Sequence, residues 1–377
     1  MKGMRSWAEI DLAKLERNLR LIRDSIPEDF KYISVVKADA YGHGILPTAS
    51  RLMQSGVDLF AVANVKEASE IREMGSGWPI LVLGPLLEEE DDALVELDLI
   101  PSVSSVEEIS RFQKLSKQTG KKIEVHLKVD TGMGRMGSWW EQASTVIEKI
   151  NSSDGLELRG VLTHFAEPSN EEFSRLQRDR FQRVISENLP TPLPRNFIVH
   201  ADNSSSLKIM EKDSVFNAVR IGLLQFGVTP PIDSALAHLH VEPVLSFHTK
   251  LALVKDLPAK TSLSYGRLHT LNRASRIGII SAGYGDAIPL HCGNQASALI
   301  RGQSYPIVGR VTMDQTLIDL TDGPNDLANG EVVTLIGQQN GNSIPLEALA
   351  LHGKTIPWEL LCSITKRVPR IYLTKRE

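Results

Sequence analysis

Short apolar runs alternate with amphipathic helical stretches along residues 12–240. In the first such stretch, apolar residues recur at spacings of three and four, as on one face of a helix; they are Leu12, Leu15, Leu19, Ile22 and Ile26. Further helices are expected at residues 49–56, 65–74, 106–119, 138–150 and 171–188. Strands are expected at residues 32–36, 59–62, 80–83, 100–103, 123–129, 158–163, 196–199 and 217–219. Eight strands alternating with helices over roughly 230 residues predict a (β/α)8 TIM-like barrel.

The pattern changes beyond residue 241, where strand-like runs follow one another closely. Turn-forming pairs such as Gly293-Asn294 and Asn329-Gly330 separate several of them. The runs are residues 243–254, 276–280, 298–301, 308–313, 315–320 and 331–336. We therefore expect a barrel over residues 12–240 and a mostly β domain over residues 241–377, the latter joined by an N-terminal strand within residues 1–11.

Composition excludes several classes of protein. Lys and Arg total 42 and Asp and Glu total 46, so the formal charge of −4 disfavours a basic nucleic-acid-binding surface. Two cysteines, Cys292 and Cys362, are too few for a disulfide framework or a Cys-rich zinc site and suit a reducing compartment. Glu9 and Asp11 interrupt the region where a signal peptide needs an apolar run, and no run approaches the roughly 18 apolar residues of a membrane span. We expect a cytoplasmic protein that needs no metal.

Polar residues follow the carboxyl ends of the predicted barrel strands, which is where barrel enzymes carry their active sites. Lys37 follows a buried run directly, and desolvation there favours a neutral, nucleophilic amine that can form a Schiff base. Taken alone, such a lysine can equally extend from the strand end to solvent. The polar residues at these ends include Lys37, Asn64, Ser104, Lys128, Asp130, His164, His200 and Arg220.

The segments after the seventh and eighth strands match the place where barrels often bind phosphate, through backbone N–H groups and helix N-termini. Ser204 as a helix N-cap, with Gly222 opposite, would form a phosphate site, although helix capping alone also accounts for the serine. A Schiff-base lysine and a phosphate site on one barrel face indicate pyridoxal phosphate. Arg220 is then placed to face the ring nitrogen of the cofactor.

With these motifs the chain resembles the alanine racemase family, whose members are pyridoxal-phosphate enzymes of fold type III. The resemblance covers nearly the whole chain, and its specificity comes from the fixed order of several short motifs. These motifs are residues 36–44 (VKADAYGHG), 128–135 (KVDTGMGR), 163–166 (THFA), 200–204 (HADNS), 219–222 (VRIG), 264–266 (SYG), 309–315 (GRVTMDQ) and 367–370 (RVPR).

The resemblance implies a homodimer with shared active sites, in which Lys37 holds the cofactor and Tyr265 from the partner subunit is the second base. Two bases on opposite faces of the substrate Cα would interconvert L-alanine and D-alanine, the latter for cell-wall peptidoglycan. The carboxylate of the substrate would bind Arg135, a guanidinium that can donate two parallel hydrogen bonds, and the backbone of Met313. Lys128 matches a lysine that is often carbamylated in the family. The implied cofactor-binding residues are Lys37, Tyr41, His164, His200, Asn203, Ser204, Arg220, Gly222 and Leu223.

The chain departs from the family near its C-terminus, where Trp358-Glu359 stands in place of the usual Tyr-Glu pair. The hydroxyl that reaches the cofactor phosphate is thereby lost, so a racemase acting on serine or on a broader set of amino acids is an alternative. A decarboxylase of this fold type would carry an acid in place of Arg220. A non-catalytic cofactor carrier would resemble the barrel alone, without the β domain that contains Tyr265 and Met313.

The expected role of Arg220 leads to a first prediction. An arginine keeps its proton, so it disfavours full protonation of the pyridine ring and leaves a weaker electron sink. We expect that sink to restrain transamination relative to proton exchange. Arg220→Glu should therefore raise the amount of keto acid formed per D-alanine produced, and an unchanged product ratio would contradict this account.

Overall fold

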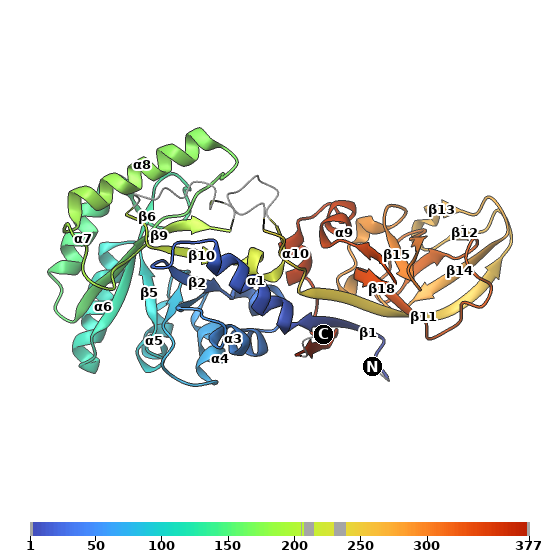
Figure 1. Cartoon of the computed structure of the whole chain (residues 1–377), viewed down its shortest axis with the longest axis horizontal. Helices are drawn as coiled ribbons and strands as arrows, with labels where there is room; N and C mark the ends of the chain where they lie inside the picture. The colour runs from blue at the N-terminus through green and yellow to red at the C-terminus, as the bar shows by residue number, and fades with distance from the viewer. Residues whose placement is uncertain (1–2, 205, 207–214, 230–238, 375–377) are drawn as a thin grey trace. The chain divides into compact units, whose positions relative to one another are not determined.

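A computed structural model describes residues 3–204, 206, 215–229 and 239–374 of the 377-residue chain (Figure 1). The chain divides into two compact units, which are described separately below. The barrel unit comprises Leu15–Ala40 and Ile45–Glu242, and the β unit comprises Met1–Lys14, Tyr41–Gly44 and Pro243–Glu377.

The barrel unit is built on a closed parallel sheet. Its strands pair in the order β2 (Lys31–Val35), β3 (Leu59–Val62), β4 (Ile80–Val82), β5 (Ile100–Val103), β6 (Ile123–Asp130), β8 (Leu156–Leu162), β9 (Ile198–Asn203) and β10 (Ala218–Ile221). Pairing of β10 with β2 closes the sheet. The prediction of a (β/α)8 TIM-like barrel is confirmed, although several strand ends are shifted from the predicted positions.

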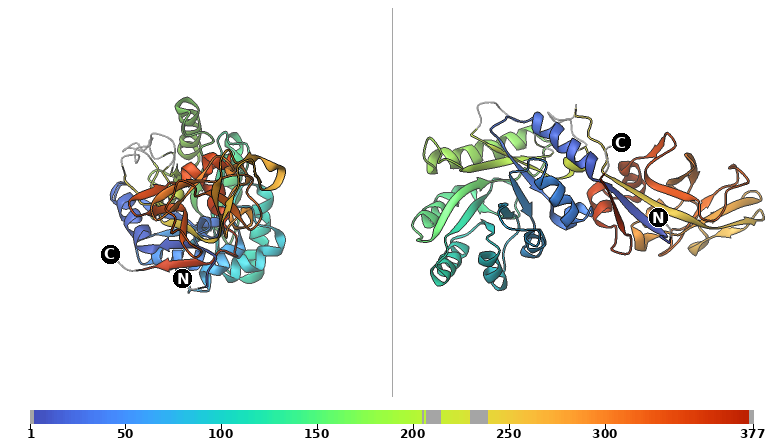
Figure 2. Two further views of the ribbon diagram at one scale, coloured as in Figure 1. Left: turned by 90° about the vertical axis from the view of Figure 1, so that its right-hand side faces the viewer. Right: turned by 60° about the horizontal axis from the view of Figure 1, so that its bottom comes forward.

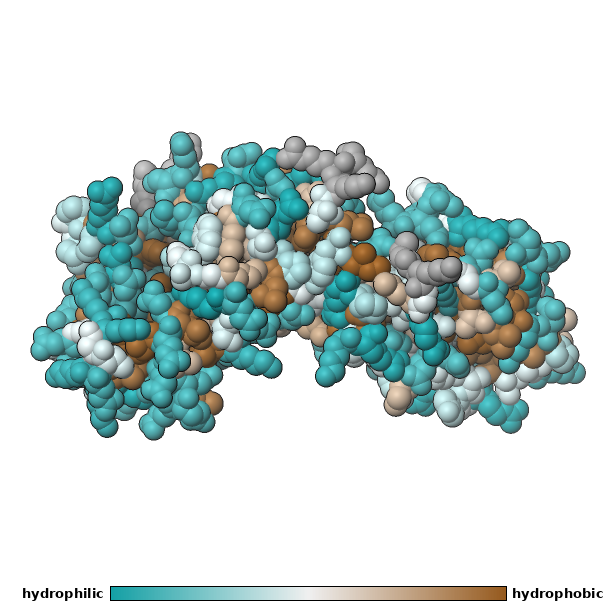
Figure 3. All heavy atoms as spheres, turned by 90° about the horizontal axis from the view of Figure 1, so that it is seen from below, coloured by the Kyte–Doolittle hydropathy of each residue, from teal (hydrophilic) through white to brown (hydrophobic). Residues whose placement is uncertain are grey.

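Helices lie around the outside of this sheet (Figures 1 and 2). They are α1 (Leu12–Asp24), α3 (Ile45–Met53), α4 (Val65–Arg72), α5 (Asp91–Glu96), α6 (Val106–Thr119), α7 (Ala143–Asn151) and α8 (Glu171–Asn188). Local signals set the ends of α6: Ser105 and Glu108 form a capping box, and Gly120 ends the helix in the left-handed conformation. Figure 3 shows hydrophilic side chains over most of the visible surface, as expected of helices whose outer faces contact water.

One predicted helix begins later than expected. Residues 138–150 were expected to be helical, but Ser138–Trp139 form the short strand β7, which pairs with Val129 and Asp130 at the end of β6. The α-helix in this segment begins only at Ala143. Helical periodicity could not reveal this, because the pairing partner lies in another strand.

The β unit contains a second sheet, which confirms the predicted mostly β domain. Strand β1 pairs antiparallel with β11 and parallel with β20. The strands of this sheet are β1 (Ser6–Asp11), β11 (Leu245–Leu257), β14 (Ser275–Ile280), β15 (Ser297–Ile300), β16 (Gln303–Pro306), β17 (Thr316–Asp319), β18 (Val332–Gln339), β19 (Asn342–Ile344) and β20 (Arg370–Leu373). A separate small hairpin of β12 (Ser262–Leu263) and β13 (His269–Thr270) and the helices α9 (Leu346–Gly353) and α10 (Pro357–Cys362) complete the unit.

The strand predicted at residues 308–313 is wrong, because this segment is a loop. Gly309 adopts a left-handed conformation (φ +73°), which breaks the extended backbone. The carbonyls of Thr312 and Met313 accept hydrogen bonds from the N–H groups of Tyr284 and Gly285 instead of joining a strand ladder. In the part of the chain that the structure describes, no helix is long and apolar enough to cross a membrane.

Candidate active site at the barrel mouth

The predicted polar residues of the barrel lie at the carboxyl ends of its strands. Lys37 follows β2, Lys128 and Asp130 end β6, and His164 follows β8. His200 and Arg220 lie within β9 and β10. Because the strands are parallel and the sheet is closed, these ends converge on one mouth of the barrel.

The backbone directly after Lys37 makes a left-handed turn. Ala38, Asp39, Ala40 and Tyr41 have φ angles of 54°, 53°, 53° and 52°, a region that non-glycine residues rarely adopt. Side chains hold the turn in place, since Glu67 Oε1 accepts from the N–H of Ala38 (2.7 Å) and Asp39 Oδ1 accepts from the N–H of Ile45 (2.7 Å). Backbone strain of this kind is characteristic of functional sites. The sequence analysis found the motif but neither the turn nor the role of Glu67.

Arg220 is buried in the barrel, and both of its terminal nitrogens, Nη1 and Nη2, are engaged with the protein. Nη1 donates to the carbonyl of His200 (2.9 Å), and Nη2 donates to the carbonyls of Thr163 (2.8 Å) and Ala201 (2.9 Å). The same guanidinium lies 2.9 Å from His200 Nδ1 and 3.2 Å from His164 Nδ1. Burial lowers the pKa of Arg220 to about 10, so the group remains a cation at neutral pH.

Burial and the neighbouring guanidinium together determine the protonation of the histidines beside Arg220. An arginine can only donate, so His164 and His200 accept at Nδ1 and the N–H of His200 lies on Nε2. That Nε2 lies 3.0 Å from His126 Nδ1. Burial, followed by the charge of Arg220, lowers the pKa of His164 to about 2. Burial, then Arg159 and Arg220, lowers the pKa of His126 to about 3. These imidazoles are therefore neutral.

Lys128 lies among several cations at the mouth of the barrel. Burial lowers the pKa of its amine to about 8, and nearby cations add to this effect. In decreasing order of effect these cations are Arg220, Arg135 and Lys37, and the carboxylate of Asp130 opposes them. The region around Lys128 thus carries excess positive charge that an anionic ligand would neutralise.

Asp130 organises the loop that carries Arg135. Its Oδ1 accepts from the N–H groups of Gly132 (2.9 Å), Met133 (2.8 Å) and Gly134 (3.1 Å). Its Oδ2 accepts from the N–H of Arg135 at 3.2 Å. The sequence analysis placed Asp130 in the polar ring without assigning it this role, because a hydrogen bond to backbone leaves little trace in a sequence.

The two segments of the predicted phosphate site meet. The N–H of Gly222 donates to Ser204 Oγ at 3.0 Å, and the short 3-10 helix Leu223–Phe226 follows Gly222. In the parallel register of β9 and β10, Asn203 lies opposite Arg220. The prediction that Ser204 caps a helix falls on the segment that follows it, in which Ser205 and residues 207–214 lie outside the described residues.

Three predicted site residues belong to the β unit and are described apart from the barrel mouth: Tyr41, Tyr265 and Met313. Tyr265 is 71% exposed and lies in a tight turn between Ser264 (φ +59°) and Gly266 (φ +73°). Ser264 Oγ donates to the carbonyl of Arg310 at 2.6 Å, which holds this turn against the loop that leads to Met313. Trp358 lies in the first turn of α10.

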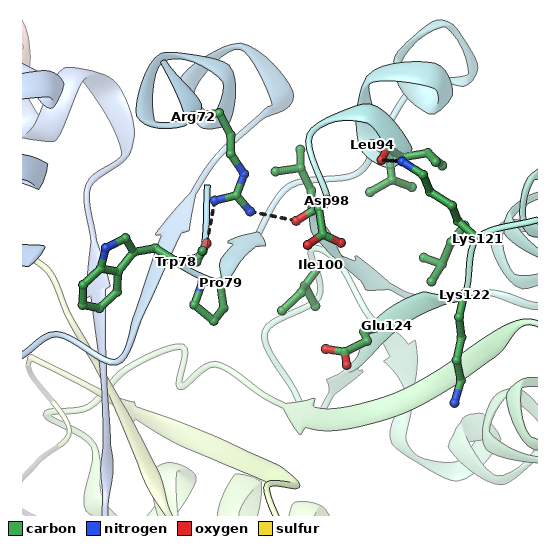
Figure 4. Close-up of a pocket in the computed structure, with 13 residues that line it drawn as sticks. Arg72, Trp78, Pro79, Leu94, Asp98, Ile100, Lys121, Lys122 and Glu124 are labelled. Atoms are coloured by element: carbon green, nitrogen blue, oxygen red, sulfur yellow. Dashed lines mark hydrogen bonds between the residues drawn. The ribbon is translucent and has the colours of Figure 1, made fainter. Parts of the chain in front are cut away.

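A separate cavity of about 280 Å³ lies at the opposite, amino-terminal end of the barrel strands (Figure 4). Arg72 lines it, but its donors are taken by the backbone carbonyls of Leu97 (2.6 Å), Trp78 (2.6 Å) and Asp98 (2.9 Å). Lys121 likewise donates to the carbonyl of Val95. These cations tie loops together, so we assign the cavity no chemistry. Within the described ranges, no three residues of metal-binding type form a cluster.

The barrel mouth, with a lysine at a strained turn and a buried arginine, defines the chain as a barrel enzyme with a cationic active site. Residues 10–230 match the family model of the alanine racemase N-terminal domain, and residues 244–372 match that of the C-terminal domain. The chain therefore belongs to the alanine racemase family, which confirms the resemblance found in the sequence.

Individual relatives match over the full length of the chain. It is 37% identical to alanine racemase from Halothermothrix orenii, covering 98% of this chain and 97% of the relative. The alanine racemase of Methanococcus maripaludis is 36% identical, with 97% and 98% covered. Among solved structures, alanine racemase from Clostridium difficile superposes with a TM-score of 0.91 at 31% identity, covering 99% and 97%. The Bartonella henselae enzyme, described with covalently bound pyridoxal phosphate, has a TM-score of 0.88 at 27% identity, covering 98% and 100%.

The buried cations predict a pH-dependent stability. The pKa of Lys128 is about 8 in the folded protein and about 10.4 when unfolded, so the unfolded state binds more protons between these values. The contribution of Lys128 to stability should therefore rise with pH across this window. Lys128→Met should be more stable than the parent at pH 7, and this advantage should shrink by about 3 kcal/mol by pH 10.5.

Urea denaturation of the cofactor-free protein in buffer free of carbon dioxide measures this difference, since a carbamate would consume the amine. Lys122→Met is the matched control, because Lys122 is an exposed lysine just before the same strand and should show no such trend. A difference between parent and Lys128→Met that stays constant with pH would contradict the prediction.

Proposed function

We propose that this protein is an alanine racemase that interconverts L-alanine and D-alanine with pyridoxal phosphate as its cofactor. The observation that carries the proposal is the buried cationic cluster at the barrel mouth, centred on Lys128 and Arg220. A phosphorylated, anionic cofactor and a substrate carboxylate both fit that charge. Relatives support it by name: the Bacillus anthracis enzyme is described with bound L-Ala-P and the Clostridium difficile enzyme with cycloserine.

The chain offers a donor for each part of the cofactor. Lys37, at the end of β2, supplies the amine for covalent attachment. Ser204 and Leu223 supply a hydroxyl and a backbone N–H group of the kind that hold phosphate, with Tyr41 as a further hydroxyl. The N–H of Gly222, which donates to Ser204 Oγ in this structure, would turn to the phosphate when the cofactor binds. His164, His200, Asn203 and Arg220 would surround the ring. When bound, pyridoxal phosphate withdraws electrons from the substrate and so acidifies its α-proton.

Arg220 acts as a fixed donor rather than an acid. Its carbonyl partners hold the guanidinium rigidly, and its pKa of about 10 keeps it protonated at neutral pH. It can donate a hydrogen bond to a ring nitrogen without transferring the proton. Arg135, on the loop shaped by Asp130, would hold the substrate carboxylate through its forked donors.

Proton transfer requires two groups on opposite faces of the substrate Cα, because one must remove the proton and the other must return it. We assign these roles to the Lys37 amine and the hydroxyl of Tyr265. The exposed position of Tyr265 suits a residue that acts on another subunit, and Leu268, 61% exposed, lies beside it. Met313 and Tyr284 are exposed in the same unit. Exposed apolar groups of this kind are typical of interfaces, which supports a homodimer with shared active sites.

The activity is tested by proton NMR of L-alanine in D2O with the holoenzyme, followed by chiral analysis of the same sample. We expect loss of the Cα proton signal together with the appearance of D-alanine, ending at equal amounts of the two enantiomers. L-serine in a parallel sample distinguishes a broader racemase. Exchange without D-alanine would contradict the second base, and the absence of both with alanine would contradict the proposed substrate.

Shared active sites are tested by mixing two inactive variants, Lys37→Ala and Tyr265→Phe. A mixed dimer would contain one doubly substituted site and one intact site. If subunits exchange fully, half of the dimers are mixed, and activity should recover to about one quarter of the parent value. Each variant alone is the control. No recovery under conditions where mass spectrometry detects mixed dimers would show that both residues act within one subunit.

A further inference from the structure

Three segments of the β unit meet at the guanidinium of Arg367. Its Nε and Nη2 donate to the two carboxylate oxygens of Asp286, each at 2.8 Å. Its Nη1 pairs with Asp314 at 2.9 Å. Nη2 also lies 3.3 Å from the carbonyl of Met313. One side chain near the C-terminus therefore ties the turn at residues 283–286 to the loop at residues 312–315.

The turn and the loop also bond to each other directly. The N–H of Tyr284 donates to the carbonyl of Thr312 and the N–H of Gly285 donates to that of Met313, both at 2.9 Å. This close approach requires glycine, since a Cβ at Gly283 would lie 2.1 Å from the carbonyl oxygen of Thr312. The side chain of Asp286 is buried, and its Oδ2 also accepts from the N–H of Gly283 at 2.9 Å. Arg367 therefore pairs with a carboxylate that is already part of the turn.

These contacts determine where the N–H of Met313 points. In a planar trans peptide the carbonyl of Thr312 and the N–H of Met313 face opposite ways. Because that carbonyl faces the turn at residues 283–286, the N–H of Met313 faces away from it. Among the backbone hydrogen bonds found in the described residues, none uses this N–H, and Met313 is 52% exposed. A donor is thus held ready for an external acceptor.

We propose that Arg367 is a positioning residue that presents the N–H of Met313 to the carboxylate of the amino-acid substrate. This inference rests on the proposed function and on the contact between the Met313 backbone and that carboxylate, which the resemblance to the family implies. Arg367 itself does not contact substrate. It sets the orientation of the Met313 peptide through Asp286, Asp314 and the Met313 carbonyl.

The test uses Arg367→Lys and Arg367→Gln in the holoenzyme, with KM and kcat for L-alanine and amide hydrogen exchange as readouts. Lysine keeps a cation beside buried Asp286. It cannot donate to both oxygens of that carboxylate and also reach Asp314 and the carbonyl of Met313, as the guanidinium does. We expect KM to rise about tenfold with kcat changed less than about twofold, because the N–H binds the carboxylate in ground and transition states alike. The amides of Tyr284 and Gly285 should exchange about tenfold faster, while those of β14 stay unchanged.

Arg273→Lys is the matched control. Arg273 pairs with Asp322 at 2.6 Å in the same unit, with both side chains exposed, and neither touches the turn or the loop. It should leave KM and the Tyr284 exchange rate at parent values. If Arg367→Gln fails to fold because Asp286 is left unpaired, Arg367→Lys still gives the result.

Two results would overturn the inference. Faster exchange at Tyr284 and Gly285 with an unchanged KM would show that the contacts of Arg367 have only a structural role. A fall in kcat with an unchanged KM would show that the Met313 peptide acts in chemistry rather than in carboxylate binding. Failure of the parent holoenzyme to racemise alanine would instead overturn the proposed function, and it would be seen before any variant is measured.

Discussion

The barrel unit depends on how it accommodates one buried cation. Burying an unpaired charge is costly, and Arg220 avoids that cost by donating to the carbonyls of Thr163, His200 and Ala201 at the ends of neighbouring strands. The carbonyl of His200 also accepts from the N–H of Thr163 at 3.3 Å, so the guanidinium is tied to the hydrogen bonding of the sheet itself. The same contacts fix the orientation of the guanidinium, and burial together with its charge keeps His164 and His200 neutral.

The excess positive charge at the barrel mouth disfavours the protein alone and favours a bound anionic ligand. Lys128 is destabilised by burial and by neighbouring cations, so the barrel carries an electrostatic cost that a bound anion would relieve. A ligand that binds only the folded state adds its binding energy to stability. Cofactor binding should thus contribute to the stability of the barrel as well as to its chemistry.

Much of the fold follows from local sequence signals. The bounds of α6 and α8 match their predicted ranges because their signals are local: Ser105 and Asn170 cap the N-termini of the two helices, and Gly120 ends α6. The loop at residues 308–313 was mistaken for a strand because hydrogen bonds from Tyr284 and Gly285, distant in sequence, decide its backbone. At the site, the strand-end residues could be found because parallel strands converge. Glu67, Asp130 and Arg367 could not be assigned roles, since they act on backbone or on other side chains.

The imidazole chain that starts at Arg220 ends inside the barrel. His200 donates toward His126, and His126 Nε2 is buried with no partner among the described residues. Within the described residues, this series of imidazoles ends at a buried nitrogen that meets no acceptor for a further proton transfer. The two imidazoles therefore separate Arg220 from the far side of the barrel and do not form a path for protons. We therefore assign proton exchange with solvent to the substrate side of the mouth, where Lys37 and Tyr265 are proposed to act.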